Sequence, residues 1–270
     1  MLPLSRFSRA ARAAVRGILT DIDDTLTTDG KLTAPAYGAM ERLRTAGLLV
    51  VPVTGRPAGW CDHIARMWPV DAVVGENGAF YFRHDPGAGK LLKRYLLDDA
   101  ERAANRRRLA GLRARVLEAV PGAAIASDQG YRDSDLAIDV CEDVPPLAAA
   151  DVDRILELCH QAGATAKLSS VHVNAWFGSY DKLTMTRICF EECFAVDLDA
   201  DREHFVFAGD SPNDAPMFGF FPNAVGVANL ADFADRLSAE PRFITEARAG
   251  AGFAELAAAL LAARGGGSAA

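Results

Sequence analysis

The 270-residue sequence lacks the features of several protein classes. Its five cysteines are odd in number and form no CxxC pair, which argues against a disulfide framework and against a cysteine zinc site. It contains no run of about 18 apolar residues, the length needed to cross a bilayer. The first residues carry arginines but no continuous apolar core of a secretory signal. These absences favour a protein of the reducing cytoplasm.

Positive charge is also scarce. The chain has 29 lysines and arginines against 36 aspartates and glutamates, a formal net charge of −7. We therefore expect neither nucleic acid nor an anionic membrane as a partner of its general surface, although a local basic pocket could still receive an anionic substrate. Half of the residues are hydrophobic, which is enough for the core of one large domain or two smaller ones. The oligomeric state is left open.

Two separate parts of the chain alternate predicted strands and helices. Apolar runs predict strands that are separated by helical patterns at 18–19, 48–53, 72–74, 204–208 and 224–228. Such alternation is typical of a parallel sheet covered by helices, an α/β fold. The closing segment, 253–263, has the composition of a helix.

The stretch between these parts has a different pattern. A hairpin pattern around PGAG at 86–89 is followed by two predicted helices, with predicted strands at 136–140 and 166–176. We therefore predict an α+β domain, 82–179, inserted into a discontinuous core of 17–81 and 180–263. Residues 1–16, a short arginine-rich leader, and 264–270, a glycine-rich tail, are predicted to be flexible ends.

Polar residues follow three of the predicted strands. Asp21, Asp23 and Asp24 come first, the TGR triplet at 54–56 second, and the segment GDSPND at 209–214 third. Ligands of open α/β sheets bind at the carboxyl ends of the strands, so these groups can converge there, with Lys182 from the start of a helix. Three acids in close succession need a cation, and a hard divalent ion is the simplest one. This set of groups fits phosphoryl transfer through an aspartyl phosphate with a magnesium ion.

These segments also carry a family resemblance. DIDDT at 21–25, TGR at 54–56, Lys182 and GDSPND at 209–214 resemble, in order, the four motifs of the haloacid dehalogenase-like superfamily. TGR and Lys182 alone are weak signals and DIDDT after an apolar strand is moderately specific, but all four in order around a large insertion are highly specific. That insertion resembles the cap of the Cof-type (type IIB) phosphatases, a group with sucrose-phosphate and mannosylphosphoglycerate phosphatases. The resemblance implies a Rossmann-like core, a Mg²⁺ cofactor and a small phosphorylated substrate, with a sugar phosphate as the first guess.

The resemblance also implies the catalytic roles. Asp21 would be the nucleophile and a metal ligand. Asp23 would protonate the leaving oxygen and later deprotonate water, with its main-chain carbonyl on the metal. Lys182 would neutralise charge between the nucleophile and the phosphoryl group. The phosphoryl oxygens would be held by Thr54 and by Gly55 and Arg56 after it.

The third acidic segment would complete the metal site. By the same resemblance, Asp210 would be the third protein ligand to magnesium. Asn213 and Asp214 would orient the ligands or Lys182 from behind. Asp24 departs from the commonest pattern, because many relatives have glycine there. It could strengthen metal binding or cap a helix, and we favour the cap.

The inserted domain should select the substrate. Strict alternation places His172, Asn174 and Trp176 on one face of a strand, where His172 and Asn174 could bind a sugar. A solvent-facing strand explains the same pattern equally well. Two other functions also remain open: a phosphomutase or phosphotransferase that passes the phosphoryl group to a second hydroxyl, and a sensor of phosphorylated metabolites without turnover.

Overall fold

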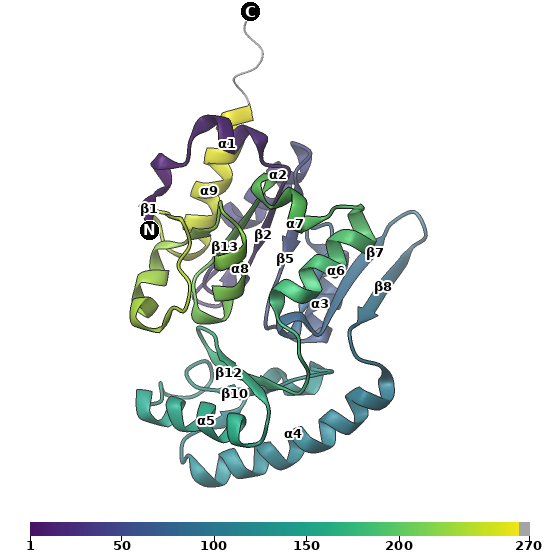
Figure 1. Ribbon diagram of the computed structural model, residues 1–270, viewed down its shortest axis with the longest axis vertical. Coiled ribbons are helices and arrows are strands. Elements are labelled where there is room, and N and C mark those ends of the chain that lie inside the picture. Colours follow the sequence, from purple (N-terminus) through teal and green to yellow (C-terminus); the bar gives the residue numbers. More distant parts are fainter. Residues whose placement is uncertain (265–270) are drawn as a thin grey trace, which may run out of the picture.

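The computed structural model describes residues 1–264, and it consists of two layered units (Figure 1). The larger unit is built on a six-stranded sheet in which every neighbouring pair is parallel. Its strands, in spatial order, are β1 (Leu2–Pro3), β15 (Phe243–Ile244), β14 (Val225–Gly226), β13 (Phe205–Gly209), β2 (Gly17–Thr20) and β5 (Leu49–Pro52). The predicted α/β class is confirmed.

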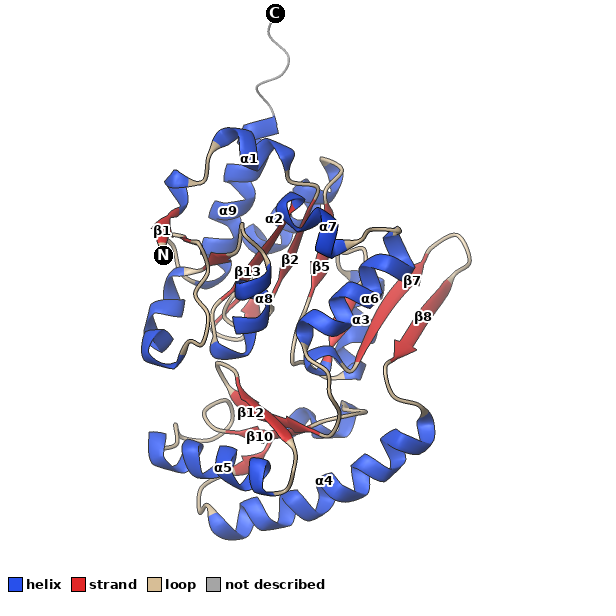
Figure 2. Ribbon diagram, in the orientation of Figure 1, coloured by secondary structure: helices blue, strands red, loops and turns tan. Residues whose placement is uncertain are grey.

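Helices cover both faces of this sheet, as Figure 2 shows. They are α1 (Arg9–Ala14), α2 (Ala34–Thr45), α3 (Ala58–Met67), α6 (Lys182–Phe194), α7 (Leu198–Asp201), α8 (Ala215–Phe220) and α9 (Ala249–Arg264). Successive residues of one strand enter different apolar cores: Ile18 packs in one core and Leu19 in the other. Because side chains alternate across a strand, both faces of β2 are buried, and its sequence is continuously apolar up to Thr20.

A hairpin extends the edge of this unit. Strand β6 (Val73–Gly75) continues beside β5 through a parallel bridge between Val53 and Val74. It pairs antiparallel with β7 (Phe80–Asp85), which pairs with β8 (Lys90–Tyr95). Phe80 and Phe82 are buried in the core beneath α3. The predicted boundary at residue 82 therefore falls inside a strand of the larger unit, because the hairpin buries aromatic side chains there. Our proposed division into core and cap now begins between β8 and α4.

The smaller unit has its own sheet and its own core. Helices α4 (Asp99–Ala119) and α5 (Ala149–Gln161) cover an antiparallel sheet in the order β11 (Thr165–Leu168), β12 (His172–Trp176), β10 (Leu136–Asp139), β9 (Ala124–Ile125). The single strand predicted for 166–176 is wrong: the chain turns between Leu168 and His172, and the two halves pair as a hairpin. Figure 1 shows this unit facing one end of the larger sheet.

The prediction of a flexible segment 1–16 is also wrong. Strand β1 pairs with β15, and the ring of Phe7 stacks on Phe243 with centroids 4.7 Å apart. Arg12 donates a hydrogen bond to the Ala259 carbonyl of α9. Apolar side chains within the arginine-rich segment thus cover the sheet edge. Of the predicted C-terminal tail, Arg264 ends α9 and 265–270 lie outside the described residues. Among residues 1–264, no helix is long and apolar enough to span a membrane.

Candidate active site

The three polar segments meet at the carboxyl edge of the sheet. Strand β2 lies between β13 and β5, so the residues that follow these strands are neighbours in space. The helix α6 adds Lys182 at its first position, directly after the Asp181 cap. The structure therefore brings together the groups that the sequence placed far apart, and their chemical roles stay predictions.

A buried lysine joins two of the carboxylates. Lys182 Nζ lies 2.6 Å from Asp21 Oδ1 and 2.7 Å from Asp214 Oδ1, and all three side chains are almost inaccessible to solvent. Burial lowers the pKa of Lys182, but Asp21 and Asp214 outweigh burial and raise it above its ordinary value. Burial raises the pKa of Asp21, Lys182 opposes this, and the neighbouring Asp214 adds to it. Lys182 is therefore a permanent positive charge beside Asp21.

A third buried carboxylate completes the cluster. Carboxylate oxygens of Asp21, Asp210 and Asp214 all lie within 4.8 Å of one another. Asp210 accepts hydrogen bonds from Thr25 Oγ1 at 2.9 Å and from Asn229 Nδ2 at 3.3 Å. Burial raises the pKa of Asp210, and the charges of Asp21 and Asp214 raise it further. Because one lysine cannot balance three carboxylates, this donor set of hard oxygens fits a divalent cation such as Mg²⁺.

The loop after β13 is shaped by Asp214 itself. Asp214 Oδ2 accepts hydrogen bonds from the main-chain N–H groups of Asp210 and Ser211. Gly209 is required for this turn, because a Cβ at that position would lie 2.4 Å from Asp214 Oδ2. Asn213 accepts a hydrogen bond from Ser211 Oγ at 2.8 Å, which orients its amide. Asp214 thus holds both the Asp210 loop and Lys182.

The loop after β5 presents donors. Thr54 Oγ1 accepts a hydrogen bond from the Arg56 N–H at 3.0 Å, so the threonine hydroxyl proton remains available. The Gly55 N–H has no acceptor within the described part of the chain. Both groups are free to donate, and their binding of a phosphoryl oxygen stays a prediction.

The Arg56 guanidinium contacts carboxylates of both units, and its binding of a phosphoryl oxygen stays a prediction. Its Nε lies 2.9 Å from each Asp23 carboxylate oxygen. Its terminal nitrogens contact two carboxylates of the smaller unit, Glu142 at 2.6 Å and Asp128 at 3.3 Å. The guanidinium carbon also lies 4.4 Å from the centre of the Trp60 ring. In this structure the Arg56 side chain therefore orients Asp23 and joins the two units, and only its backbone belongs to the Thr54 loop.

The predicted substrate-binding residues of β12 are buried. His172 Nε2 lies 2.8 Å from Glu142 Oε2, and Asn174 Nδ2 donates to Asp135 Oδ2 at 3.0 Å. Contact with His172 lowers the pKa of Glu142 to about 2, with a further contribution from Arg56 and against the effect of burial. Trp176 instead packs in the core of the larger unit. The solvent-facing interpretation of this strand is wrong, and binding of substrate by His172 and Asn174 stays a prediction.

Asp24 does not cap a helix. Its φ is +54°, and a turn follows it. This left-handed conformation is the one that glycine adopts without strain and that aspartate tolerates better than most residues. The helix-cap expectation is therefore wrong, and the position accepts Gly or Asp because of its backbone.

Sequence reasoning missed Glu76, a residue that joins the two units. The buried carboxylate of Glu76 accepts hydrogen bonds from the main-chain N–H groups of Ala58 and of residues 133–135 in the smaller unit. Arg132 donates to the Gly55 carbonyl at 2.8 Å and pairs with Asp128 and Asp135. The signal for Glu76 in the sequence is the GENG segment at 75–78, which directly follows the predicted strand at 72–74. Contacts across an inserted domain leave no spacing pattern in the sequence.

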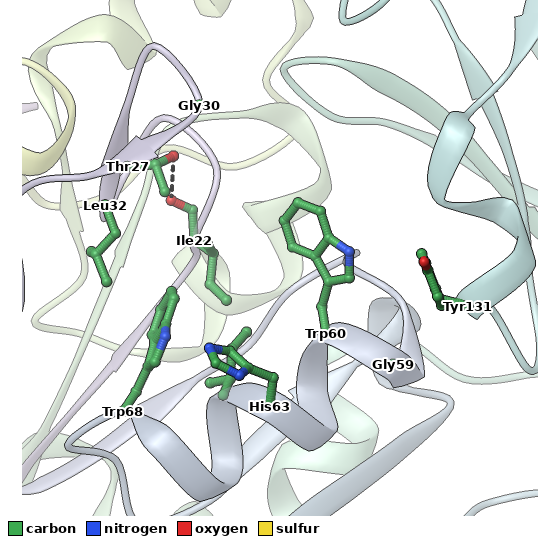
Figure 3. A pocket seen from close by; sticks show the side chains of 10 residues that line it. Ile22, Thr27, Gly30, Leu32, Gly59, Trp60, His63, Trp68 and Tyr131 are labelled. Atoms are coloured by element: carbon green, nitrogen blue, oxygen red, sulfur yellow. Dashed lines mark hydrogen bonds between the residues drawn. The ribbon is translucent and has the colours of Figure 1, made fainter.

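A separate, mostly apolar pocket lies beside these loops. Figure 3 shows Trp60 of α3 and Tyr131, from the smaller unit, on neighbouring sides of it. The rest is formed by the hairpin of β3 (Thr27–Thr28) and β4 (Lys31–Leu32), by Ile22 and by further residues of α3. Its volume is about 460 Å³, and the Trp60 and Tyr131 side chains are 41% and 62% exposed. A small organic group fits a pocket of this size.

Comparison with known proteins gives a consistent result. Residues 18–103 match the family model of the haloacid dehalogenase-like hydrolases. The C-terminal domain of C. albicans trehalose-6-phosphate phosphatase matches with a TM-score of 0.70 at 12% identity, over 94% of this chain and 95% of that one. A HAD/COF-like hydrolase from Plasmodium vivax matches with a TM-score of 0.66 at 16% identity, over 93% and 96%. Sucrose-phosphatase from Synechocystis sp., in complex with sucrose and phosphate, matches with a TM-score of 0.62 at 15% identity, over 91% and 98%. No curated protein matches the sequence significantly.

The fold and the carboxylate–lysine cluster define an enzyme with a Rossmann-like core and an inserted second unit. Residues 18–103 match the haloacid dehalogenase-like hydrolases, and the fold of the whole chain is similar to that of a HAD/COF-like hydrolase. The resemblance inferred from the four motifs is confirmed.

Proposed function

We propose that the protein is a magnesium-dependent phosphatase that hydrolyses a small phosphomonoester through an aspartyl phosphate on Asp21. The observation that carries this proposal is the buried cluster in which Lys182 contacts both Asp21 and Asp214, with Asp210 within 4.8 Å. A carboxylate that is held next to a fixed cation and beside free hydroxyl and amide donors is suited to attack phosphorus.

The reaction has two steps. First, an Asp21 carboxylate oxygen attacks phosphorus in line, while Asp23 donates a proton to the leaving oxygen. Lys182, Thr54 and the Gly55 N–H stabilise the phosphoryl oxygens during this step. Second, Asp23 accepts a proton from a water molecule, and the resulting hydroxide releases phosphate from Asp21. The Arg56 guanidinium holds the Asp23 carboxylate in place for both transfers.

The metal would be held by Asp21 and Asp210 through their carboxylates and by Asp23 through its main-chain carbonyl. Asp214 would act from behind, because its oxygens already contact Lys182 and main-chain N–H groups. When bound, magnesium supplies positive charge that offsets the negative charge of the phosphoryl group.

A sugar phosphate is the proposed substrate class. Two of the structurally similar proteins are named for trehalose-6-phosphate and sucrose-phosphate phosphatase activity, which supports this choice by fold alone. His172 and Asn174 could contribute hydrogen bonds to hydroxyls, and the Trp60 and Tyr131 pocket offers aromatic faces for a sugar ring. No nucleic acid or membrane partner is part of the proposal, and we propose a cytoplasmic enzyme.

Phosphate release from a panel of sugar, cofactor and nucleotide monophosphates tests the proposal. We expect magnesium-dependent turnover of a sugar phosphate that is abolished by chelator and by Asp21→Asn. Asp153→Asn, on the exposed face of α5, is the matched control and should keep full activity. If folded protein releases phosphate from no member of the panel, the hydrolase proposal fails, and transfer to a second hydroxyl or sensing without turnover becomes the better explanation.

A further inference from the structure

The turn of η2 (Glu76–Gly78) is strained and buried. Its three residues have φ angles of +44°, +53° and +105°, and all of them are buried. A left-handed conformation is unfavourable for Glu and better tolerated by Asn, and consecutive left-handed residues persist only where the surroundings enforce them. Such strain is concentrated at functional sites, so this turn calls for a functional explanation.

The turn contacts every loop of the active site that lies outside the Asp21 segment. The Asn77 N–H donates to the Thr54 carbonyl at 3.0 Å. Gly78 packs so closely on the start of α6 that a Cβ there would lie 2.0 Å from the Asp181 carbonyl oxygen, one residue before Lys182. Asn77 Oδ1 accepts a hydrogen bond from Asn213 Nδ2 at 3.3 Å. The turn therefore fixes the Thr54, Lys182 and Asp210 segments relative to one another.

The amide nitrogen of Asn77 is a buried donor beside the Thr54 loop. The Asn77 residue is 2% exposed, yet its Nδ2 has no hydrogen-bond acceptor within residues 1–264. It lies beside Gly55, about 3.1 Å from the position that a Cβ on that residue would take. The cost of burying an unsatisfied N–H group is about 1–3 kcal/mol, so such a group is expected to have a partner in the working state of the protein.

The free donor lies where a phosphoryl group is expected. Gly55 N–H, the Thr54 hydroxyl and Asn77 Nδ2 come from adjoining segments, and none of these three donors has an acceptor within the described residues. The Oδ1 atom of Asn77 is occupied by Asn213, which fixes the carboxamide so that its NH₂ group points away from that contact. A phosphoryl group has three oxygens with several lone pairs, and the Asp21 segment with Lys182 does not saturate them.

We propose that Asn77 is a further phosphoryl-binding residue, whose Nδ2 donates a hydrogen bond to a non-bridging oxygen of the substrate and of the product phosphate. This inference rests on the proposed function, because it assumes that phosphate binds between the Thr54 loop and Lys182. It adds a residue outside the four motifs, and it gives the strained turn at 76–78 a function.

Two substitutions separate donation by Nδ2 from a purely structural role. Asn77→Asp keeps an oxygen for Asn213 and the tolerance for a positive φ, but it removes the NH₂ donor. Asn77→Gly removes the whole side chain and relieves the strain, since glycine adopts φ near +53° freely. Asn223→Asp is the control, because Asn223 donates to the Glu203 carbonyl at the amino end of β13, opposite the active site.

Binding of inorganic phosphate with magnesium, measured by calorimetry, is the first readout. We expect Asn77→Gly to weaken phosphate binding about tenfold to a hundredfold, the effect of losing a hydrogen bond to a charged acceptor. Asn77→Asp should weaken it at least as much, and the control should not change it. In the wild-type protein, the side-chain NH₂ resonances of Asn77 should shift when phosphate is added, a readout that does not depend on the folding of a variant.

Several results would overturn the inference. If Asn77→Asp binds phosphate as tightly as the wild type and Asn77→Gly does not, the side chain acts only through Oδ1 on Asn213. If neither variant changes phosphate affinity, or if the Asn77 resonances do not respond, Asn77 does not contact the phosphoryl group. If the wild-type protein itself binds no phosphate, the proposed function fails as well, and the two failures are thereby distinguished.

Discussion

Replacing Asp210 by Asn should stabilise the protein in the absence of metal. Asp210 is buried with Asp21 and Asp214, their oxygens lie within 4.8 Å, and only Lys182 offsets their charge. At a pH above the raised pKa of both carboxyls, removing one charge from a pair at this separation relieves about 3 kcal/mol of repulsion at an effective dielectric constant of about 20. The new amide cannot accept the hydrogen bond from Asn229 Nδ2, which costs about 1 kcal/mol.

The net effect is a stabilisation of about 2 kcal/mol in chelator, equivalent to a rise in Tm of about 4–8 °C for a chain of this size. With magnesium present, the wild type should instead be the more stable of the two proteins. A ligand at about one hundred times its Kd stabilises the wild type by about 2.7 kcal/mol, and the variant should lose nearly all of that gain because a metal ligand is missing. Chelator and magnesium should therefore reverse the ranking of the two proteins.

Thermal unfolding can be followed by circular dichroism in chelator and in saturating magnesium. The first condition measures the relief of repulsion, and the second measures the stabilisation by bound metal. Asp153→Asn removes an exposed carboxylate and should leave both Tm values close to those of the wild type. The reasoning is refuted if Asp210→Asn melts below the wild type in chelator, because repulsion would then not dominate. It is refuted also if the variant keeps the full magnesium shift, because Asp210 would then not bind the metal.

Two more predictions concern stability away from the metal. The pKa of Glu142 is lowered from 4.5 to about 2 by His172 and Arg56, so its stabilising effect is complete above about pH 4.5 and is lost as the pH falls through the folded pKa. After allowance for the partial exposure of Glu142, Glu142→Gln should lose about 2 kcal/mol less free energy of unfolding on acidification than the wild type. Urea unfolding at a series of pH values measures this difference. Identical pH profiles of the two proteins would contradict the contact. Gly78 has a φ of +105°, and the Cβ of an alanine there would lie 2.0 Å from the Asp181 carbonyl oxygen. Gly78→Ala should therefore destabilise the protein by about 3 kcal/mol or more. Gly111→Ala, in the middle of α4 with open space around it, should instead stabilise by about 0.5–1 kcal/mol, and equal effects at both glycines would refute the packing argument.

Much of the fold could be predicted from local patterns. The runs at 18–19, 48–53 and 204–208 are apolar on both faces, which indicates a sheet that is covered by helices on both sides. The start of α4 has a capping box of Asp98 and Glu101, a local sequence signal for the start of a helix. The hairpin of β11 and β12 and the order in segment 1–16 were missed, because their strands form through pairing partners elsewhere in the structure and carry weak local signals.

The sequence by itself determined which residues were predicted to form the site, because Asp21, Lys182 and Asp210 belong to motifs whose order and residue types are specific. It could not determine what the remaining polar groups contact. The tertiary structure decided that the Arg56 side chain joins Asp23 to Glu142, that Asp24 occupies a left-handed turn, and that Asn77 lies between Gly55 and Asn213. The physical reason is that the positions of strands and helices follow from local periodicity, whereas contacts between loops and an inserted unit depend on how separately folded surfaces pack together.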